Sequence, residues 1–228
     1  MQVHLVRHRL GDGGARRAMC ARLSCGSCAE TLELVEPGRR LEVATVRAGM
    51  LQLAAQVGAP GVLHLTPAAV FCMAYLVEEQ ELQQGFNLVE FQNLVDQIHS
   101  SLVFLAVIYT CGHYSLVICT RSSLAVPWDI WYGDSVPRQS PQCHMVATRL
   151  LTMLDFLEPD QVVPASDPGS QGEEWASGLW CLAALERELA RLAGVPLPPV
   201  LDLLALAGRL NSFIRVLQLC TWTYLGSC

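Results

Sequence analysis

Lysine is absent from this chain of 228 residues, so all 15 of its basic side chains belong to arginine. Two explanations remain open: a codon bias of the genome, and escape of the chain from conjugation to its own lysines. Charge is also scarce, since charged residues make up 16% of the sequence, hydrophobic residues make up 52%, and the net charge is -6. This balance excludes a disordered chain and argues against nucleic acid as the main partner. We expect any recognised surface to be that of a protein.

Long apolar segments are missing as well. The longest apolar stretches, residues 102–110 and 201–208, fall well short of the roughly 20 residues that span a bilayer, so no membrane association is expected. The first residues contain arginine and histidine without an apolar centre, which argues against a secretory signal. We therefore expect an intracellular protein, cytoplasmic or nuclear, whose cysteines are mostly free and buried.

Motifs for cofactors and metals are not evident. Nothing resembles a phosphate loop, a nucleotide fingerprint or a metal-binding helix. Cys20, Cys25 and Cys28 lie close in the sequence, with His4 or His8 as a conceivable fourth ligand, but their spacing matches no common closed zinc site. We therefore expect no metal and no cofactor.

Clusters of glycine and proline divide the chain. Residues 1–38 show no sustained period and are expected to form a loosely ordered arm, whereas residues 39–228 are expected to form one domain. Apolar residues at helical spacing predict helices over residues 41–57, 66–82, 87–100, 142–157, 175–194 and 200–219. Runs rich in β-branched and aromatic residues predict strands over residues 102–109, 113–119 and 127–133, with a short strand or extended segment at 161–166. This order of elements indicates an α+β architecture.

A histidine, an aspartate and a serine in this region suggest acyl-transfer chemistry. His113 opens a predicted strand, so its ring can project at the strand end and act as a general base. Asp134 ends the next strand, and because neighbouring strands lie about 4.8 Å apart, its carboxylate can reach the ring and fix its tautomer. Ser177 lies at a predicted helix N-terminus, where the helix dipole favours negative charge on a nucleophile.

Two further residues fit the same chemistry. Gln171 can turn its amide toward an oxyanion, together with backbone N–H groups at the helix start, and Gly178 allows close approach of backbone and substrate. Each residue alone also fits a structural role, such as a core histidine, a turn aspartate or a helix cap. The occurrence of His113, Asp134, Gln171 and Ser177 in this order indicates acyl-transfer chemistry more specifically than any one of these residues does.

These residues resemble the ubiquitin-like-protein proteases of the Ulp/SENP type, cysteine peptidases that cleave SUMO-like modifiers and are related to the adenovirus protease. In that family a His-Trp pair is followed by an Asp-Ser pair and then by Gln-x5-Cys-Gly at the start of a helix. The likeness covers roughly residues 60–195, and its motif positions hold His113-Tyr114, Asp134-Ser135, and Gln171 with Ser177-Gly178. It implies a papain-like, adenain-like α+β fold with a central mixed sheet flanked by helices.

The resemblance also implies a reaction and a partner. The reaction is hydrolysis of a peptide or isopeptide bond after the C-terminal glycine of a ubiquitin-like modifier. By resemblance, the general base is His113, its orienter is Asp134, the oxyanion donor is Gln171 and the nucleophile is residue 177. Tyr114 replaces the usual tryptophan as an aromatic wall for a Gly-Gly tail, and we expect Trp175 and Gly178 to contact the substrate beside it.

Serine at position 177 is the main departure from the family pattern. A thiol ionises readily beside a histidine and a helix N-terminus, whereas a hydroxyl must lose its proton during attack. Three explanations remain open: a deliberate substitution that traps a complex, a naturally inactive protein, and an unusual serine peptidase. The alternative function is therefore a non-catalytic binder of a ubiquitin-like modifier or an extended peptide.

Other functions and nucleophiles are weaker candidates. A peptidase that acts on ordinary polypeptide remains a third possibility. Cys181 lies one helical turn beyond Ser177, but its apolar neighbours place it in the core. Cys143 and His144 are adjacent in the sequence, a spacing that disfavours contact between their side chains.

Overall fold

The computed structural model of the chain describes residues 32–57, 62–65, 88–135, 140–163, 174–196 and 203–225. It contains two compact units, of which the first includes the described residues from 62 to 177 and the second includes residues 32–57 and those from 178 onward. Most of the expected N-terminal arm and all of the predicted helix over residues 66–82 lie outside the described residues.

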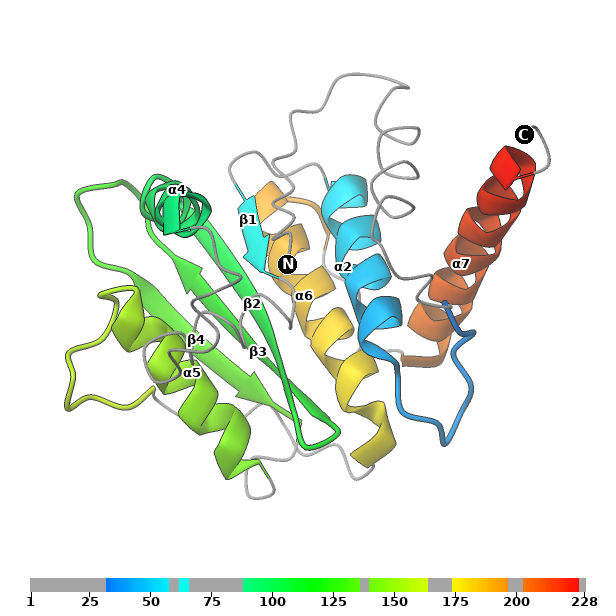
Figure 1. Cartoon of the computed structure of the whole chain (residues 1–228), viewed down its shortest axis with the longest axis horizontal. Coiled ribbons are helices and arrows are strands. Elements are labelled where there is room, and N and C mark those ends of the chain that lie inside the picture. Colours follow the sequence, from blue (N-terminus) through cyan, green and yellow to red (C-terminus); the bar gives the residue numbers. More distant parts are fainter. Residues whose placement is uncertain are drawn as a thin grey trace. The chain divides into compact units, whose positions relative to one another are not determined.

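A four-stranded sheet forms the centre of the first unit, with the strand order β1-β2-β3-β4 (Figure 1). Its strands are β1 Val62–Leu65, β2 Val103–Thr110, β3 His113–Thr120 and β4 Asp129–Asp134. β1 pairs with β2 in parallel, whereas the pairs β2–β3 and β3–β4 are antiparallel, so the sheet is mixed as expected. Sequence prediction misses β1, because a strand of 4 residues is too short to show a period.

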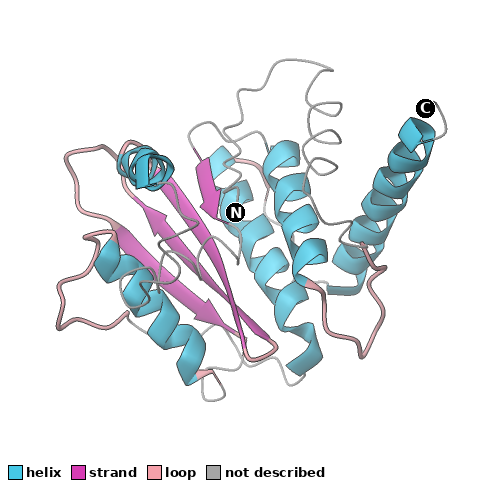
Figure 2. Cartoon of the chain, viewed as in Figure 1, coloured by secondary structure: helices cyan, strands magenta, loops and turns pink. Residues whose placement is uncertain are grey.

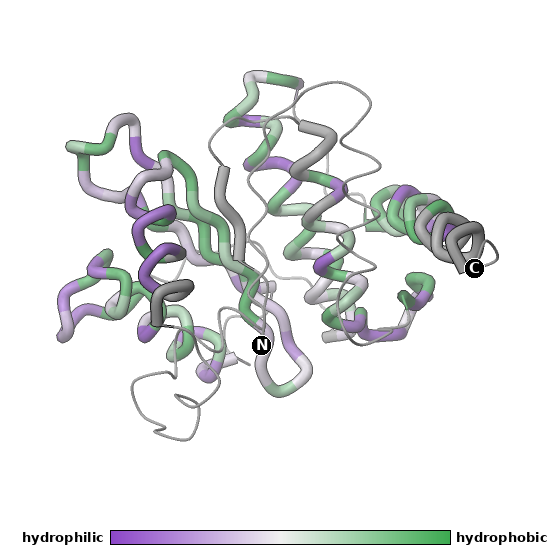
Figure 3. The backbone as a smooth tube through the Cα atoms, turned by 45° about the horizontal axis from the view of Figure 1, so that its top comes forward, coloured by the Kyte–Doolittle hydropathy of each residue, from purple (hydrophilic) through white to green (hydrophobic). Residues whose placement is uncertain are grey.

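Helix α5, Pro141–Met153, packs on one face of this sheet (Figure 2). Period-two alternation along the strands and helical spacing along α5 bring their apolar side chains together. The shared core contains Phe104, Ala106 and Ile108 of β2, Val117 and Cys119 of β3, Tyr132 of β4, and Cys143, Val146, Ala147, Leu150 and Leu151 of α5. Figure 3 shows the hydrophobic colouring of the central strands. Helix α4, Leu88–His99, adds Ile98 to the same core.

The turn between β2 and β3 fixes the start of β3. Cys111 and Gly112 have φ angles of 51° and 78°, and Thr110 pairs with His113 across them. Positive φ at both positions of a two-residue hairpin loop matches the right-handed twist of the strands, and glycine adopts it without strain. The hairpin therefore sets His113 as the first residue of β3.

The segment after α5 differs from the sequence prediction. The helix ends at Met153 rather than at residue 157, since Asp155 has a φ of 56° and the Phe156 N–H donates to the Leu151 carbonyl at 2.8 Å. Residues 161–163 form no strand, because the Val163 carbonyl accepts from His144 at 2.7 Å and its N–H donates to Thr148 at 3.4 Å. Of the two alternatives predicted for residues 161–166, a strand or an extended segment, the strand does not form over the described residues 161–163.

The second unit is helical. It contains α2 Val43–Val57, α6 from its second residue onward, and α7 Leu203–Leu225, where α6 spans Ser177–Ala193. The Asn211 side chain of α7 accepts from the Val35 N–H at 2.6 Å and donates to the Val35 carbonyl at 3.0 Å, which joins α7 to the segment before α2. Arg209 of α7 pairs with Glu186 of α6 at 2.7 Å. None of the helices in the described part of the chain is long and apolar enough to cross a membrane.

Candidate active site

A histidine and a carboxylate meet at one end of the sheet. His113 Nε2 lies 2.7 Å from Asp134 Oδ1, and the exposed fractions of the two side chains are 12% and 1%. Because an ionised carboxylate only accepts hydrogen bonds, the proton of this bond resides on Nε2. The remaining ring nitrogen, Nδ1, is then the one that can exchange a proton with a nucleophile.

Sheet register explains this contact. Asp134 pairs directly with Ser115, and His113 lies two residues before Ser115 on the same face of β3. His113 and Asp134 are therefore diagonal neighbours, about 7–8 Å apart at Cα, a distance that an imidazole ring and a carboxylate can bridge. Because Asp134 is buried, the attraction between its carboxylate and a protonated His113 ring is stronger than it would be in water.

Ser177 reaches the same end of the sheet from another segment. The Tyr114 N–H, one residue after His113, donates a hydrogen bond to Ser177 Oγ at 3.3 Å. Ser177 is 1% exposed and is the first residue of α6, directly after the 3-10 turn η3, Glu174–Ala176. Among the residues that the structure describes, its hydroxyl has no hydrogen bond to the His113 ring.

Comparison with known proteins gives a clear result for structure and none for sequence. No protein-family model and no curated protein matches the sequence. The Xanthomonas campestris effector protein XopD bound to ubiquitin matches with a TM-score of 0.62 and 15% identity, over 83% of this chain and 96% of XopD. The fold is that of the Ulp1-like proteases.

Two SUMO proteases support the same conclusion. Ulp1 with its catalytic cysteine oxidised to a sulfonic acid matches with a TM-score of 0.50 and 15% identity, over 91% of this chain and 94% of Ulp1. The Ulp1-like SUMO protease catalytic domain of Chaetomium thermophilum matches with a TM-score of 0.51 and 14% identity, over 93% of this chain and 90% of that domain. The expected α+β fold with a mixed sheet is confirmed.

The Ulp1-like fold brings together only part of the predicted set of site residues. His113, Asp134 and Ser177 meet at one end of the sheet, and the backbone of Tyr114 connects them. The Tyr114 ring is buried and packs against the Tyr109 ring with centroids 4.5 Å apart. Trp175 lies half-buried in η3, and Gly178 follows Ser177 in α6. Gln171 lies outside the described residues.

Two residues of this site are missed by sequence reasoning. The Tyr132 hydroxyl donates to Asp134 Oδ2 at 3.2 Å, and the Cys143 thiol donates to the His113 carbonyl at 3.7 Å. The signal for Tyr132 is its position two residues before Asp134, which places both side chains on one face of β4. No comparable signal marks Cys143, because its contact depends on how α5 packs on the sheet.

The buried thiols nearby are poor nucleophiles in this Ulp1-like fold. Burial raises the pKa of the Cys143 thiol, so it stays protonated at neutral pH. Cys181 is fully buried in α6, as its apolar neighbours predict. His144 is turned away from Cys143, since its Nε2 donates to the Val163 carbonyl.

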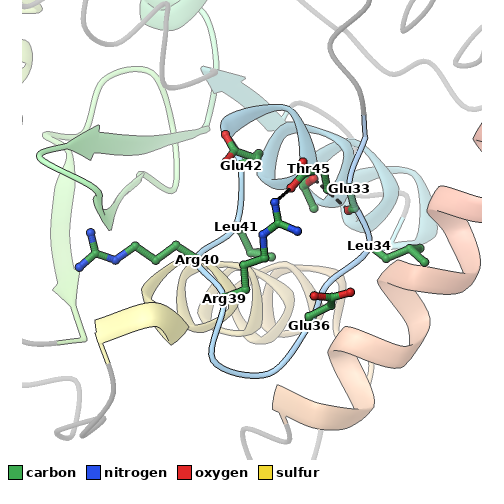
Figure 4. A pocket seen from close by; sticks show the side chains of 8 residues that line it. All are labelled: Glu33, Leu34, Glu36, Arg39, Arg40, Leu41, Glu42 and Thr45. Atoms are coloured by element: carbon green, nitrogen blue, oxygen red, sulfur yellow. Dashed lines mark hydrogen bonds and ion pairs between the residues drawn. The ribbon is translucent and has the colours of Figure 1, made fainter.

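A metal site and a surface hollow are two other places where function could reside. Within the described residues, no group of three or more His, Cys, Asp or Glu side chains gathers to hold a metal ion. Cys20, Cys25 and Cys28 lie outside those residues. The hollow in Figure 4 lies in the segment before α2, where Arg39 pairs with Glu33 at 2.6 Å. The residues that line it include acidic side chains and arginines, but no histidine and no cysteine.

Proposed function

We propose that this chain is a Ulp-type peptidase-like domain that acts at the C-terminal glycine of a ubiquitin-like modifier. The observation that carries the proposal is the 2.7 Å contact between His113 and Asp134, with Ser177 bound to the next backbone amide. The structures of XopD with ubiquitin and of SUMO proteases with the same fold support this class of substrate. The chain then hydrolyses a peptide or isopeptide bond.

The proposed reaction begins at residue 177. His113, oriented by Asp134, takes the proton of the nucleophile through Nδ1 while the nucleophile attacks the glycine carbonyl. Gln171 and backbone N–H groups at the start of α6 hold the oxyanion. His113 then protonates the leaving amine, and water hydrolyses the acyl enzyme with His113 again as base. Tyr114, Trp175 and Gly178 are the proposed contacts for the glycine tail.

A non-catalytic binder is the second candidate, because one observation favours it. The Ser177 hydroxyl accepts from the Tyr114 N–H, and in the described part of the chain it makes no hydrogen bond to His113. A hydroxyl without a base to take its proton stays protonated and attacks slowly. The native chain then holds a modifier tail without cleaving it.

The remaining parts of the proposal concern the chain around the site. We propose a loosely ordered arm over residues 1–38 and a peptidase-like domain over residues 39–228. Cys111, Cys119, Cys143 and Cys181 are free thiols, which suits the reducing compartment that we propose for this protein. Its proposed partner is a protein modifier rather than nucleic acid or a membrane.

Hydrolysis of fluorogenic amides at the C-termini of ubiquitin and SUMO tests the proposal. Three proteins are compared: the native chain, Ser177→Cys, and Ser177→Cys combined with His113→Ala. We expect Ser177→Cys to cleave at least one substrate, and the added His113→Ala to abolish cleavage.

Binding of the uncleaved modifiers by calorimetry separates the two candidates. Binding by the native chain without cleavage by any variant favours the non-catalytic binder. If none of the three proteins binds or cleaves either modifier, both candidates are wrong.

A further inference from the structure

The second oxygen of the Asp134 carboxylate has a partner of its own. The Tyr132 hydroxyl donates to Oδ2 at 3.2 Å while His113 Nε2 lies 2.7 Å from Oδ1. Tyr132 is 3% exposed and Asp134 is 1% exposed, so this pair is withdrawn from bulk water. A carboxylate with both oxygens bonded in a buried site has a fixed orientation.

Fixing this orientation matters for the histidine. The torsion that turns an aspartate carboxylate about its Cβ–Cγ bond has broad minima, so one hydrogen bond leaves the plane of the group loosely defined. A second donor on the other oxygen locks that plane. This bond helps to keep Oδ1 in line with the Nε2–H bond of His113, which sets the tautomer and direction of the ring.

Tyr132 is itself held in place from α5. Its ring packs edge-on against the His144 ring, with centroids 5.3 Å apart and an interplanar angle of 86°. His144 Nε2 donates in turn to the Val163 carbonyl at 2.7 Å. Burial raises the pKa of the Tyr132 phenol, and the charge of Asp134 adds to this effect, so the hydroxyl keeps its proton at neutral and mildly alkaline pH.

We propose that Tyr132 is a positioning residue of the site: its hydroxyl fixes the Asp134 carboxylate, and the carboxylate fixes His113 for proton transfer at residue 177. The role of Tyr132 in proton transfer at residue 177 rests on the proposed function. Its role in fixing Asp134 and His113 does not. Among the described residues, the titratable groups that face Asp134 include His113 on β3, Tyr132 on β4 and Cys143 on α5.

The first test is proton NMR of the native chain, and it needs no substrate. A hydrogen-bonded Nε2–H proton of His113 resonates downfield and exchanges slowly with water, and His113→Gln assigns it. We expect Tyr132→Phe to shift this resonance upfield and broaden it. The Nε2–H of His144 provides the internal control, because a phenylalanine ring preserves its contact with residue 132.

The second test measures covalent labelling in the Ser177→Cys background with ubiquitin that carries a C-terminal electrophile. Loss of a hydrogen bond to a charged group corresponds to about a tenfold fall in rate. We expect Tyr132→Phe to slow the inactivation step by about tenfold without changing the binding constant of the probe. Tyr109→Phe is the matched control, since it removes the hydroxyl of a residue that is 37% exposed and keeps the ring packed on Tyr114.

The two tests separate the inference from the proposed function. If Ser177→Cys reacts with no probe, the proposed function fails, and the His113 resonance still decides the role of Tyr132. An unchanged His113 resonance in Tyr132→Phe overturns the inference whatever the labelling rate. If Tyr132→Phe does not fold, site-specific replacement of Tyr132 by 3-fluorotyrosine changes the strength of the bond at nearly the same volume, because its hydroxyl is more acidic. A shift of the His113 resonance then supports the inference, and an unchanged resonance overturns it.

Discussion

Replacement of Ser177 by cysteine converts the proposed nucleophile into a group whose ionisation can be measured. Two features of the structure favour a thiolate at this position: the Tyr114 N–H that donates to Oγ at 3.3 Å, and the start of α6 at residue 177 itself. A hydrogen bond to a charged group contributes about 1.5–3 kcal/mol, and a helix N-terminus contributes about 0.3–1 kcal/mol.

Together these two effects amount to about 2–4 kcal/mol, which lowers a thiol pKa by about 1.5–3 units from its usual value of about 8.5. Ser177 is 1% exposed, and burial at this position raises the thiol pKa. A protonated His113 ring nearby lowers the thiol pKa again, because it attracts the thiolate. We therefore expect the pKa of the introduced thiol in the Ser177→Cys protein to lie below about 7.5.

The pH dependence of alkylation by iodoacetamide, followed at residue 177 by peptide mass spectrometry, measures this pKa. Exposed Cys111 reacts in the same sample and serves as an internal reference. Addition of Asp134→Asn removes the charge that stabilises protonated His113 and should raise the thiol pKa by about one unit or more. A thiol pKa at or above about 8.5, or one insensitive to Asp134→Asn, would refute the reasoning.

Three further predictions concern stability. Gly133→Ala places a Cβ 2.1 Å from the Trp131 ring, so the ring must move, and the urea midpoint should fall by the equivalent of about 1–3 kcal/mol. Arg121→Met removes hydrogen bonds to carbonyls at the end of α4 and a guanidinium 4.2 Å above the Trp128 ring, and calorimetry should show a loss of about 1–3 kcal/mol. Burial, with a smaller effect of a nearby carboxylate, raises the pKa of Cys119 in the folded chain. The stability that the protonated Cys119 thiol gives the folded chain is therefore fully present below the usual thiol pKa of about 8.5. As the pH rises further, the free energy of unfolding falls by up to about 1.4 kcal/mol per pH unit. Cys119→Ala should flatten that decline in urea titrations.

Matched variants separate these effects from general damage. Gly208→Ala adds a Cβ with nothing within 4 Å and should not destabilise the chain, so an equal loss there would contradict the steric reason for Gly133. Arg39→Met removes only an exposed ion pair and should cost less than about 1 kcal/mol. Cys111→Ser removes an exposed thiol, and it should leave the alkaline decline as steep as in the native chain.

Local patterns in the sequence account for much of the fold. The strands β2, β3 and β4 carry long β-branched and aromatic runs, and α6 ends within one residue of the predicted boundary. The contact between His113 and Asp134 follows from the same reasoning, since it requires only that two adjacent strands place both residues at one end of the sheet. Periodicity over short distances is enough for such inferences.

Contacts that depend on packing or on the backbone could not be predicted in this way. The Tyr114 N–H that binds Ser177 belongs to a residue 63 positions away, and a contact made by a backbone group leaves no mark in the sequence. Residues 161–163 include two valines typical of a strand, yet the backbone groups of Val163 bond to side chains of α5 instead. The hydrogen bond from Tyr132 to Asp134 Oδ2 depends on the rotamer of Tyr132, which the sequence pattern does not determine.

Covalent capture at residue 177 tests the central claim most directly. Ser177→Cys protein is mixed with ubiquitin and SUMO probes that carry an electrophile after the terminal glycine, and the modified residue is identified by mass spectrometry. We expect an adduct on the introduced thiol at position 177 that His113→Ala abolishes. An adduct only on other cysteines, or labelling of position 177 at the same rate without His113, would contradict a reaction centre formed by His113, Asp134 and residue 177.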